Sequence, residues 1–305
     1  MDNANNYGET LDNANEYGET PLWIASWEGK ISKVNTLLKN GANVNQARTT
    51  DGATPLYIAS YLGYLQVVNA LLNHGANVNE ARTTDGATPL YVASEGGYKE
   101  VVEALLNRGA AVNKERTDTG ETPLYVASER GSIEVVNTLL NRGAAVDKER
   151  TIWGATPLYV ASERGYKEVV EALLNRGADV DKARTIDGET PLYVASYEGK
   201  YQVVEVLLKH GAAVDKAKTT DGETPLYVAS EGGKYQVVEA LLQHGADVNK
   251  KTQEGKTPLD VAFGPQVASA LQAALDKQKG GRKTKRLRKK YKKTKKNKKS
   301  VVKNE

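Results

Sequence analysis

The triplet Thr-Pro-Leu recurs along this chain at a nearly constant interval. Successive copies start 34 residues apart, except the last, which follows after 33. The eight copies begin at Thr20, Thr54, Thr88, Thr122, Thr156, Thr190, Thr224 and Thr257. A fixed period of this length is typical of a stack of similar units, each burying apolar side chains against its neighbours. A stack has no separate cores, so the 305 residues do not predict two globular domains. It is first of all a surface, and we expect a binding protein.

A single unit predicts two helices and a loop. Thr88 is placed to cap a first helix, and Pro89 fits its first turn, where no N–H is needed. A glycine pair ends this helix, because glycine adopts left-handed backbone angles at low cost. A second helix with apolar residues at helical spacing ends at Gly109. Residues 110–121 then predict an extended, two-stranded finger that leads to the next threonine.

Two helices and a turn, opened by T-P-L-x-x-A, resemble the ankyrin repeat over residues 18–275. The resemblance implies an all-α solenoid of stacked helix-turn-helix pairs with projecting β-turn fingers. It also implies protein–protein binding, with the partner on the concave side against the finger tips and first helices. We expect residues 1–18 to be disordered or to form a partial finger. Residues 19–276 are expected to form about seven repeats and a C-terminal capping unit, and residues 277–305 a disordered polybasic tail.

The chain departs from the usual ankyrin period of 33 residues. Thirteen residues separate Gly211 from Thr224, whereas 12 separate Gly245 from Thr257. The threonine-to-glycine distance stays at 21 residues, so the additional residue lies in the finger and not in the helices.

The histidine of the family's T-P-L-H is also replaced. Trp23 stands there in the first copy and Asp260 in the last, with tyrosine between: Tyr57, Tyr91, Tyr125, Tyr159, Tyr193 and Tyr227. We interpret this column as packing between repeats and not as a ligand ladder. The serine three residues after each tyrosine is expected to bond back to a carbonyl of its own helix.

Residues that could carry chemistry are sparse. There is no cysteine, which excludes disulfides, thiolate metal sites and cysteine nucleophiles. The three histidines, His74, His210 and His244, share one repeat position at the end of the second helix, where a cation suits the helix dipole. The sequence therefore predicts no catalytic residue, metal site or cofactor, and a protein that is not an enzyme.

Positions that differ between repeats are free to specify a partner. Near the end of the first helices, and at one finger tip, they include aromatic, apolar and arginine side chains that are common in interfaces. The predicted partner-binding residues are Trp27, Tyr61, Leu62, Arg130, Ile152, Trp153, Arg164 and Tyr197. The alternatives are solvated helix ends and, for Trp153, packing against Ile186 of the next finger. Two sets of cations recur in register on the fingers: one runs from Arg48 to Lys218, and the other comprises Lys114, Lys148, Lys182, Lys216 and Lys250. This ladder is expected to pair with acids on adjacent fingers, namely Glu115, Glu149, Asp147, Asp181 and Asp215.

Charge is divided unevenly along the chain. Residues 277–305 hold 16 Lys or Arg and one acid, a net charge of +15, whereas the preceding residues carry −11. The basic clusters resemble a nuclear localisation signal read by an import receptor. The residues concerned are Lys283, Lys285, Arg286, Arg288, Lys289, Lys290, Lys292, Lys293, Lys295 and Lys296. Binding to nucleic acid or another anionic surface, and a merely solvated tail, remain the alternatives.

No stretch of the sequence has the length and apolarity of a signal peptide or a membrane span. We expect a monomeric intracellular protein of the nucleus or cytoplasm.

Overall fold

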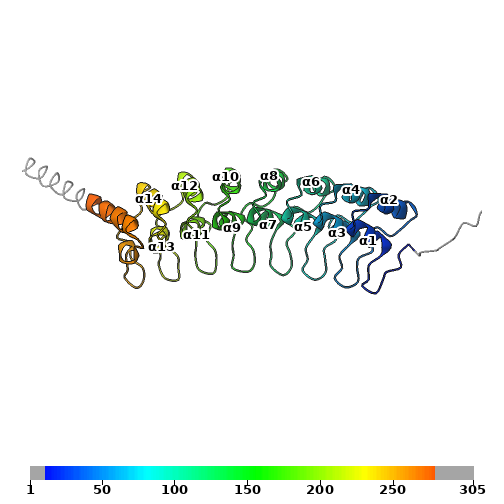
Figure 1. The fold of residues 1–305 in the computed structure, drawn as a ribbon, viewed down its shortest axis with the longest axis horizontal. Coiled ribbons are helices and arrows are strands. Elements are labelled where there is room, and N and C mark those ends of the chain that lie inside the picture. The colour runs from blue at the N-terminus through cyan, green and yellow to red at the C-terminus, as the bar shows by residue number, and fades with distance from the viewer. Residues whose placement is uncertain (1–10, 279–305) are drawn as a thin grey trace, which may run out of the picture. The chain divides into compact units, whose positions relative to one another are not determined.

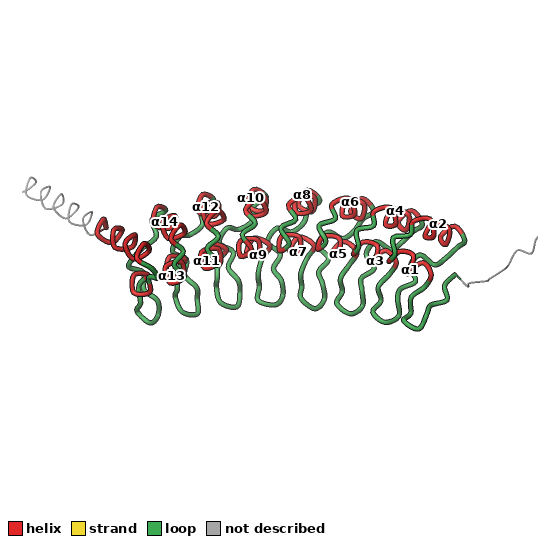
Figure 2. Tube along the Cα trace, in the orientation of Figure 1, coloured by secondary structure: helices red, strands yellow, loops and turns green. Residues whose placement is uncertain are grey.

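The computed structural model describes residues 11–278, which form paired helices linked by turns and finger-shaped loops (Figures 1 and 2). Each repeat opens with a first helix: α1 (Pro21–Trp27), α3 (Pro55–Tyr61), α5 (Pro89–Glu95), α7 (Pro123–Glu129), α9 (Pro157–Arg164), α11 (Pro191–Tyr197) and α13 (Pro225–Glu231). A second helix follows in each: α2 (Ile31–Lys39), α4 (Leu65–Asn73), α6 (Lys99–Asn107), α8 (Ile133–Asn141), α10 (Lys167–Asn175), α12 (Tyr201–Lys209) and α14 (Tyr235–Gln243). The capping unit holds a 3₁₀ turn, η1 (Pro258–Val261), and a helix over residues 265–278. The predicted all-α solenoid of helix pairs is confirmed.

The chain divides into two compact units, one up to Ile186 and one from Asp187 onward. In the N-terminal unit, α1, α3, α5, α7 and α9 pack side by side in one row, and α2, α4, α6, α8 and α10 form a second row. In the C-terminal unit α11 packs on α13, and α12 on α14. Every first helix also packs on the second helix of its own repeat, and the fingers extend from the first-helix row (Figure 1).

The Thr-Pro-Leu motif starts each first helix as predicted. The threonine side chain accepts the backbone N–H three residues on, for example that of Tyr57 on Thr54 at 3.1 Å, and proline occupies the first turn. The leucine that follows is fully buried in every repeat from Leu22 to Leu226. One short motif therefore sets both where the helix begins and which side faces the stack.

The aromatic column is buried between repeats, which confirms its interpretation as packing. All six tyrosines are at most 5% exposed. The hydroxyl of Tyr91 donates to Glu121 at 2.8 Å and that of Tyr193 to Glu223 at 2.9 Å, in each case one repeat further on. Trp23 does the same with its indole N–H, which donates to the Ala53 carbonyl at 3.0 Å.

The serine three residues after each aromatic of this column behaves as predicted in most repeats. Its hydroxyl donates to the carbonyl four residues earlier, at 2.7 Å in the Ser94–Leu90 pair and 2.8 Å in the Ser26–Leu22 pair. Ser60 and Ser162 are exceptions, since their buried hydroxyl oxygens have no hydrogen-bond partner.

The prediction of a two-stranded finger is wrong, because no β-strand occurs within residues 11–278. Inside a finger, only a short turn closes: the Arg48 N–H donates to the Ala53 carbonyl and the Gly52 N–H to the Arg48 carbonyl, both at 2.9 Å. Other finger contacts reach the neighbouring repeat.

At the base of three fingers of the N-terminal unit, an asparagine makes one such contact. Asn113 accepts the backbone N–H of Ala145 at 2.8 Å and donates to the Gly143 carbonyl at 3.4 Å, so it joins two repeats through both ends of its amide. Asn45 and Asn79 make the same pair of bonds. Asp147 occupies the next position and accepts from the Asp179 N–H at 3.1 Å, but a carboxylate has no N–H to donate.

We expect Asp147→Asn to stabilise the protein. Burial raises the pKa of Asp147 because it disfavours the charged carboxylate. A carboxyl whose pKa is higher in the folded chain destabilises the fold above that pKa, and this penalty fades as pH falls toward the unfolded value. The variant also gains a donor facing the repeat that follows. The expected gain in unfolding free energy is about 1 kcal/mol at neutral pH, and less near pH ~4.

Urea unfolding at both pH values measures this gain. The matched control is Asn113→Asp, which places a carboxylate at an equivalent junction and should lower stability. An Asp147→Asn protein that is less stable than the parent at neutral pH contradicts the interpretation.

Candidate protein-interaction surface

Two sets of side chains, one at the ends of the first helices and one at the finger tips, are candidates for contact with a partner. The helix-end row consists of the residue after the buried serine of each first helix. In the N-terminal unit it comprises Trp27, Tyr61, Glu95, Glu129 and Glu163, and in the C-terminal unit Tyr197 and Glu231. The finger tips are the residues before the finger glycines: Asp51, Asp85, Thr119 and Trp153 in the first unit, and Asp187 and Asp221 in the second.

Hydrogen bonds between neighbouring fingers hold the tips in place. Thr83 donates both its backbone N–H and its hydroxyl to the Asp51 carbonyl, at 2.9 and 2.7 Å. The same pair of bonds joins Thr151 to Thr119, at 3.0 and 2.8 Å, and Thr219 to Asp187, at 2.8 and 2.6 Å. Each finger is therefore positioned by the tip of the finger before it.

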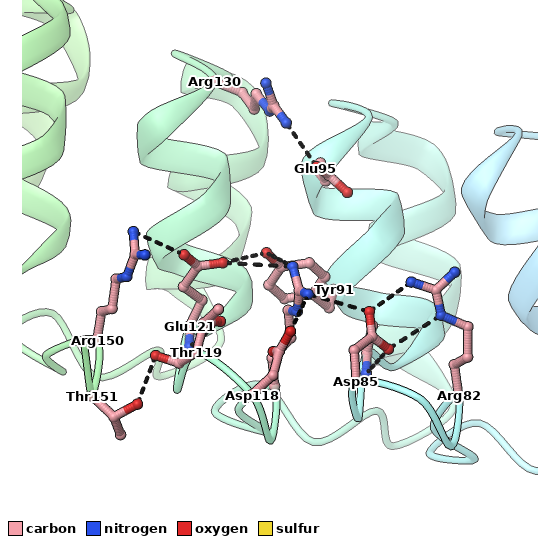
Figure 3. Close-up of polar contacts among 12 residues, drawn as sticks. Arg82, Asp85, Tyr91, Glu95, Asp118, Thr119, Glu121, Arg130, Arg150 and Thr151 are labelled. Atoms are coloured by element: carbon pink, nitrogen blue, oxygen red, sulfur yellow. Dashed lines mark hydrogen bonds and ion pairs between the residues drawn. The ribbon is translucent and has the colours of Figure 1, made fainter. Parts of the chain in front are cut away.

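The arginines on the fingers contact both aromatic rings and acidic side chains. Arg48, Arg82 and Arg116 stack on the aromatic ring of the preceding first helix, with guanidinium-to-centroid distances of 4.5, 5.2 and 5.3 Å. They also pair with finger acids: Arg82 with Asp85 at 2.6 Å, and Arg116 with Asp85 at 3.3 Å and with Asp118 at 2.7 Å (Figure 3).

The predicted pairing is confirmed for two lysines of the ladder: Lys148 pairs with Glu115 at 3.0 Å and Lys182 with Glu149 at 2.8 Å. Arg48, Arg82 and Arg116 pair with other acids than those predicted. Because an arginine side chain extends along the stack, it reaches the tip aspartate and the neighbouring ring before the acid next to it in sequence.

Glu121 is a second buried acid in this network (Figure 3). It is 7% exposed, accepts from the Tyr91 hydroxyl at 2.8 Å, and pairs with Arg150 at 3.2 Å. Burial, opposed by the hydrogen bond from Arg116, raises the pKa of Tyr91, so the phenol stays protonated and donates. This network joins successive repeats.

Most of the residues predicted to bind a partner reach the surface. Trp27, Tyr61 and Tyr197 are about half exposed, at 53%, 51% and 57%. Arg130 and Arg164 are exposed and pair with the helix-end acid of the preceding repeat, Glu95 at 2.7 Å and Glu129 at 3.5 Å. Leu62 is only partly exposed.

Trp153 occupies a tip position at which most other fingers carry an aspartate. At the tips that carry an aspartate, its side chain closes the turn, as Asp51 does by accepting the Ala53 N–H at 3.1 Å. An indole cannot accept this bond. Trp153 has a φ of 74°, the only positive value at a non-glycine residue in the part of the chain that the structure describes. The neighbouring finger's Thr185 hydroxyl reaches its carbonyl at 3.3 Å, a longer distance than at the other tips.

The ring of Trp153 is half exposed and is stacked by Arg150, whose guanidinium lies 4.7 Å from the ring centroid. Ile152 and Ile186 are also exposed, at 41% and 62%. Together these three side chains form an apolar tip cluster on two adjacent fingers.

Sequence reasoning missed a second set of exposed aromatics. Tyr64, Tyr98 and Tyr166 follow the glycine turn between the two helices of their repeats and are more than a third exposed. In the sequence, each of these tyrosines directly follows the turn glycine, and this pattern could have identified them. Every predicted tail residue, from Lys283 to Lys296, lies outside the described residues.

The histidines lie at helix ends. In each, Nδ1–H donates to the carbonyl four residues earlier, at 2.8 Å in His74 and 2.9 Å in His210 and His244. Over residues 11–278, no three potential ligands among His, Asp and Glu are grouped closely enough to hold a metal ion. Within the same range, no helix combines the length and apolarity needed to cross a membrane.

Comparison with protein-family models agrees with this geometry. A model of ankyrin repeats in three copies matches residues 42–116, 79–150, 112–184, 144–218, 181–252 and 213–279, and a single ankyrin-repeat model matches residues 17–49. A search of curated proteins finds no match to the chain. The family's repeats generally serve as non-enzymatic modules that bind other proteins. The stacked helix pairs, the Thr-Pro-Leu caps and these matches place the chain in the ankyrin-repeat family.

Proposed function

We propose that this chain is a non-enzymatic scaffold or adaptor that binds another protein through its finger tips and helix-end row. The observation that carries the proposal is Trp153, an exposed indole at a tip where the repeats otherwise place a turn-forming residue. Its surroundings, the apolar tip cluster with the arginine stacked on it, have the composition of an interface hot spot.

Local energetics support this assignment. A left-handed backbone at a residue other than glycine costs on the order of 1 kcal/mol, and the lost side-chain bond to the turn costs a similar amount. Stacking of Arg150 on the ring offsets only part of these terms, since the ring remains half exposed. Residues that oppose their local structure without a packing gain are expected at functional sites.

The helix-end residues extend this surface toward the first helices. The ion pairs of Arg130 and Arg164 are exposed, and pairs of this kind contribute little to stability. Their side chains can therefore exchange partners when another protein binds. Trp27, Tyr61 and Tyr197 add apolar area within the helix-end row, and Leu62 adds some next to Tyr61.

We also propose that the polybasic tail, residues 277–305, directs the protein to the nucleus through an import receptor. Its net charge of +15 and low apolar content support this role. The alternative is that the tail binds nucleic acid or another polyanion and the array serves only as a scaffold. On either basis we expect the protein to act as a monomer.

Trp153→Ala is expected to weaken binding to an isolated partner about 30-fold, the loss typical of a hot-spot residue. Trp153→Asp should weaken binding comparably but raise the unfolding midpoint, because aspartate restores the turn bond seen at Asp51. Calorimetric titration measures affinity, and thermal unfolding measures stability. Thr119→Asp, at the adjacent tip, is the control and should leave affinity unchanged. Equal affinity of Trp153→Ala and the parent protein would rule out this hot spot.

Deleting residues 280–305 separates the two roles of the tail. Nuclear targeting predicts that a fluorescent fusion of the full chain accumulates in the nucleus and that the deletion abolishes this. The alternative predicts tight binding to duplex DNA or RNA that falls steeply with salt and disappears with the tail. Nuclear accumulation that survives the deletion contradicts the targeting role.

A further inference from the structure

Four exposed aromatic side chains lie together near the start of the N-terminal unit. Trp27, Tyr61, Tyr64 and Tyr98 are 53%, 51%, 38% and 37% exposed. We call them the aromatic strip. Two of them belong to the helix-end row, and the other two follow the glycine turns between helices.

Contacts with turn glycines fix how the strip is arranged. The ring of Tyr64 lies over Gly29, where a Cβ would be 3.0 Å from the ring, and Gly29 is two residues beyond Trp27. The ring of Tyr98 lies over Gly63 at 2.7 Å, and Gly63 is two residues beyond Tyr61. Both glycines also have positive φ, so a side chain at either position would be disfavoured by its backbone angles as well as by the clash with the ring. The strip is therefore two aromatic pairs, Trp27 with Tyr64 and Tyr61 with Tyr98, one repeat apart.

The spacing of the two pairs matches one class of peptide. Helices α1 and α3 pack directly against each other, and packed helices lie about 8–10 Å apart. A polyproline II helix rises about 3.1 Å per residue, so residues three apart are separated by about 9 Å. A P-x-x-P segment laid along the strip places one proline on each aromatic pair, which is how aromatic-lined surfaces recognise such segments.

Hydrogen bonding fits the same occupant. A polyproline II segment makes no internal hydrogen bonds, so its carbonyls need donors. The three tyrosines supply hydroxyl groups that can donate to them. The ring positions carry no charge, while Glu28 and Glu95 lie next to the two ends in exposed ion pairs with Lys30 and Arg130. Exposed pairs contribute little to stability, so a basic residue beside the prolines can replace either cation, whereas an acidic one cannot.

The strip has a definite length and area. In the following repeat its two positions hold Glu95 and Ser132, and in the C-terminal unit Tyr197 stands with Lys234, which lies over Gly199. The four residues expose on the order of 400 Å². A stable dimer buries about 800 Å² on each partner, so the strip is too small for a second copy and large enough for a short peptide.

We propose that the aromatic strip binds a proline-rich segment of the partner in polyproline II conformation, with P-x-x-P spacing and a basic flank. The inference rests on the proposed function and specifies the partner chemistry for one part of the surface. The apolar tip cluster around Trp153 is a separate contact.

Titration of the full chain with a peptide of one arginine followed by about nine prolines tests this proposal. A measurable affinity, with a Kd below about 1 mM, is expected. Tyr61→Glu should weaken it at least about 10-fold. This variant copies Glu95, the native residue of the next repeat, and is therefore compatible with the fold. Tyr197→Glu, at the same position in the C-terminal unit, is the matched control and should bind like the parent, as should Trp153→Ala.

Three results would overturn the proposal. They are no binding of the proline peptide, equal binding of a Gly-Ser peptide of the same length with the same arginine, or equal affinity in Tyr61→Glu. Concentration-dependent dimerisation that Tyr61→Glu abolishes would assign the strip to a second copy. If Trp153→Ala weakens the intact partner while the proline peptide does not bind, the strip proposal alone fails. If the peptide binds but Trp153→Ala leaves partner affinity unchanged, the tip hot spot alone fails.

Discussion

Burial of the first helix of each repeat against its neighbours is the contact on which this molecule depends. A helix of seven or eight residues is too short to be stable in water by itself. Here each has a threonine cap, and its leucine and aromatic side chains are covered by adjoining repeats. Stability is then a sum of similar interfaces, and no single repeat holds a core of its own. Positions that contact the next repeat are fixed by this requirement, and the positions that point away from it are left to carry function.

Much of this could be predicted from the sequence because the period aligns equivalent residues. The helix starts at Thr54 and Thr88, and the burial of Tyr91, followed from local propensity and register. The finger was harder to predict, since the Thr83 N–H donates to the Asp51 carbonyl of the neighbouring finger and not to a partner strand within its own finger. A one-dimensional pattern contains no information about such contacts between repeats.

The candidate surface shows the same division. Exposure of Trp27, Tyr61 and Tyr197 could be predicted, because the other repeats carry a glutamate at the same position and a charged residue is expected to face solvent. The left-handed backbone of Trp153 could not, as the sequence shows an unusual residue but not its φ. The partners of Arg82 and Arg116 were misassigned, because a long side chain can reach several acids at similar distances along a stack. Tyr64 and Tyr98 were missed because their glycine contacts cross between repeats.

Asp147 and Trp153 lie at the base and the tip of the same finger. That finger therefore combines a junction lacking the donated amide bond with a tip lacking its turn-closing side chain. Local opening is cheapest where such bonds are fewest. At the proposed site, a protein that binds this tip would also restrain the junction at Asp147, so part of its binding energy would go into ordering the array. Partner occupancy and the rigidity of neighbouring repeats would then be coupled.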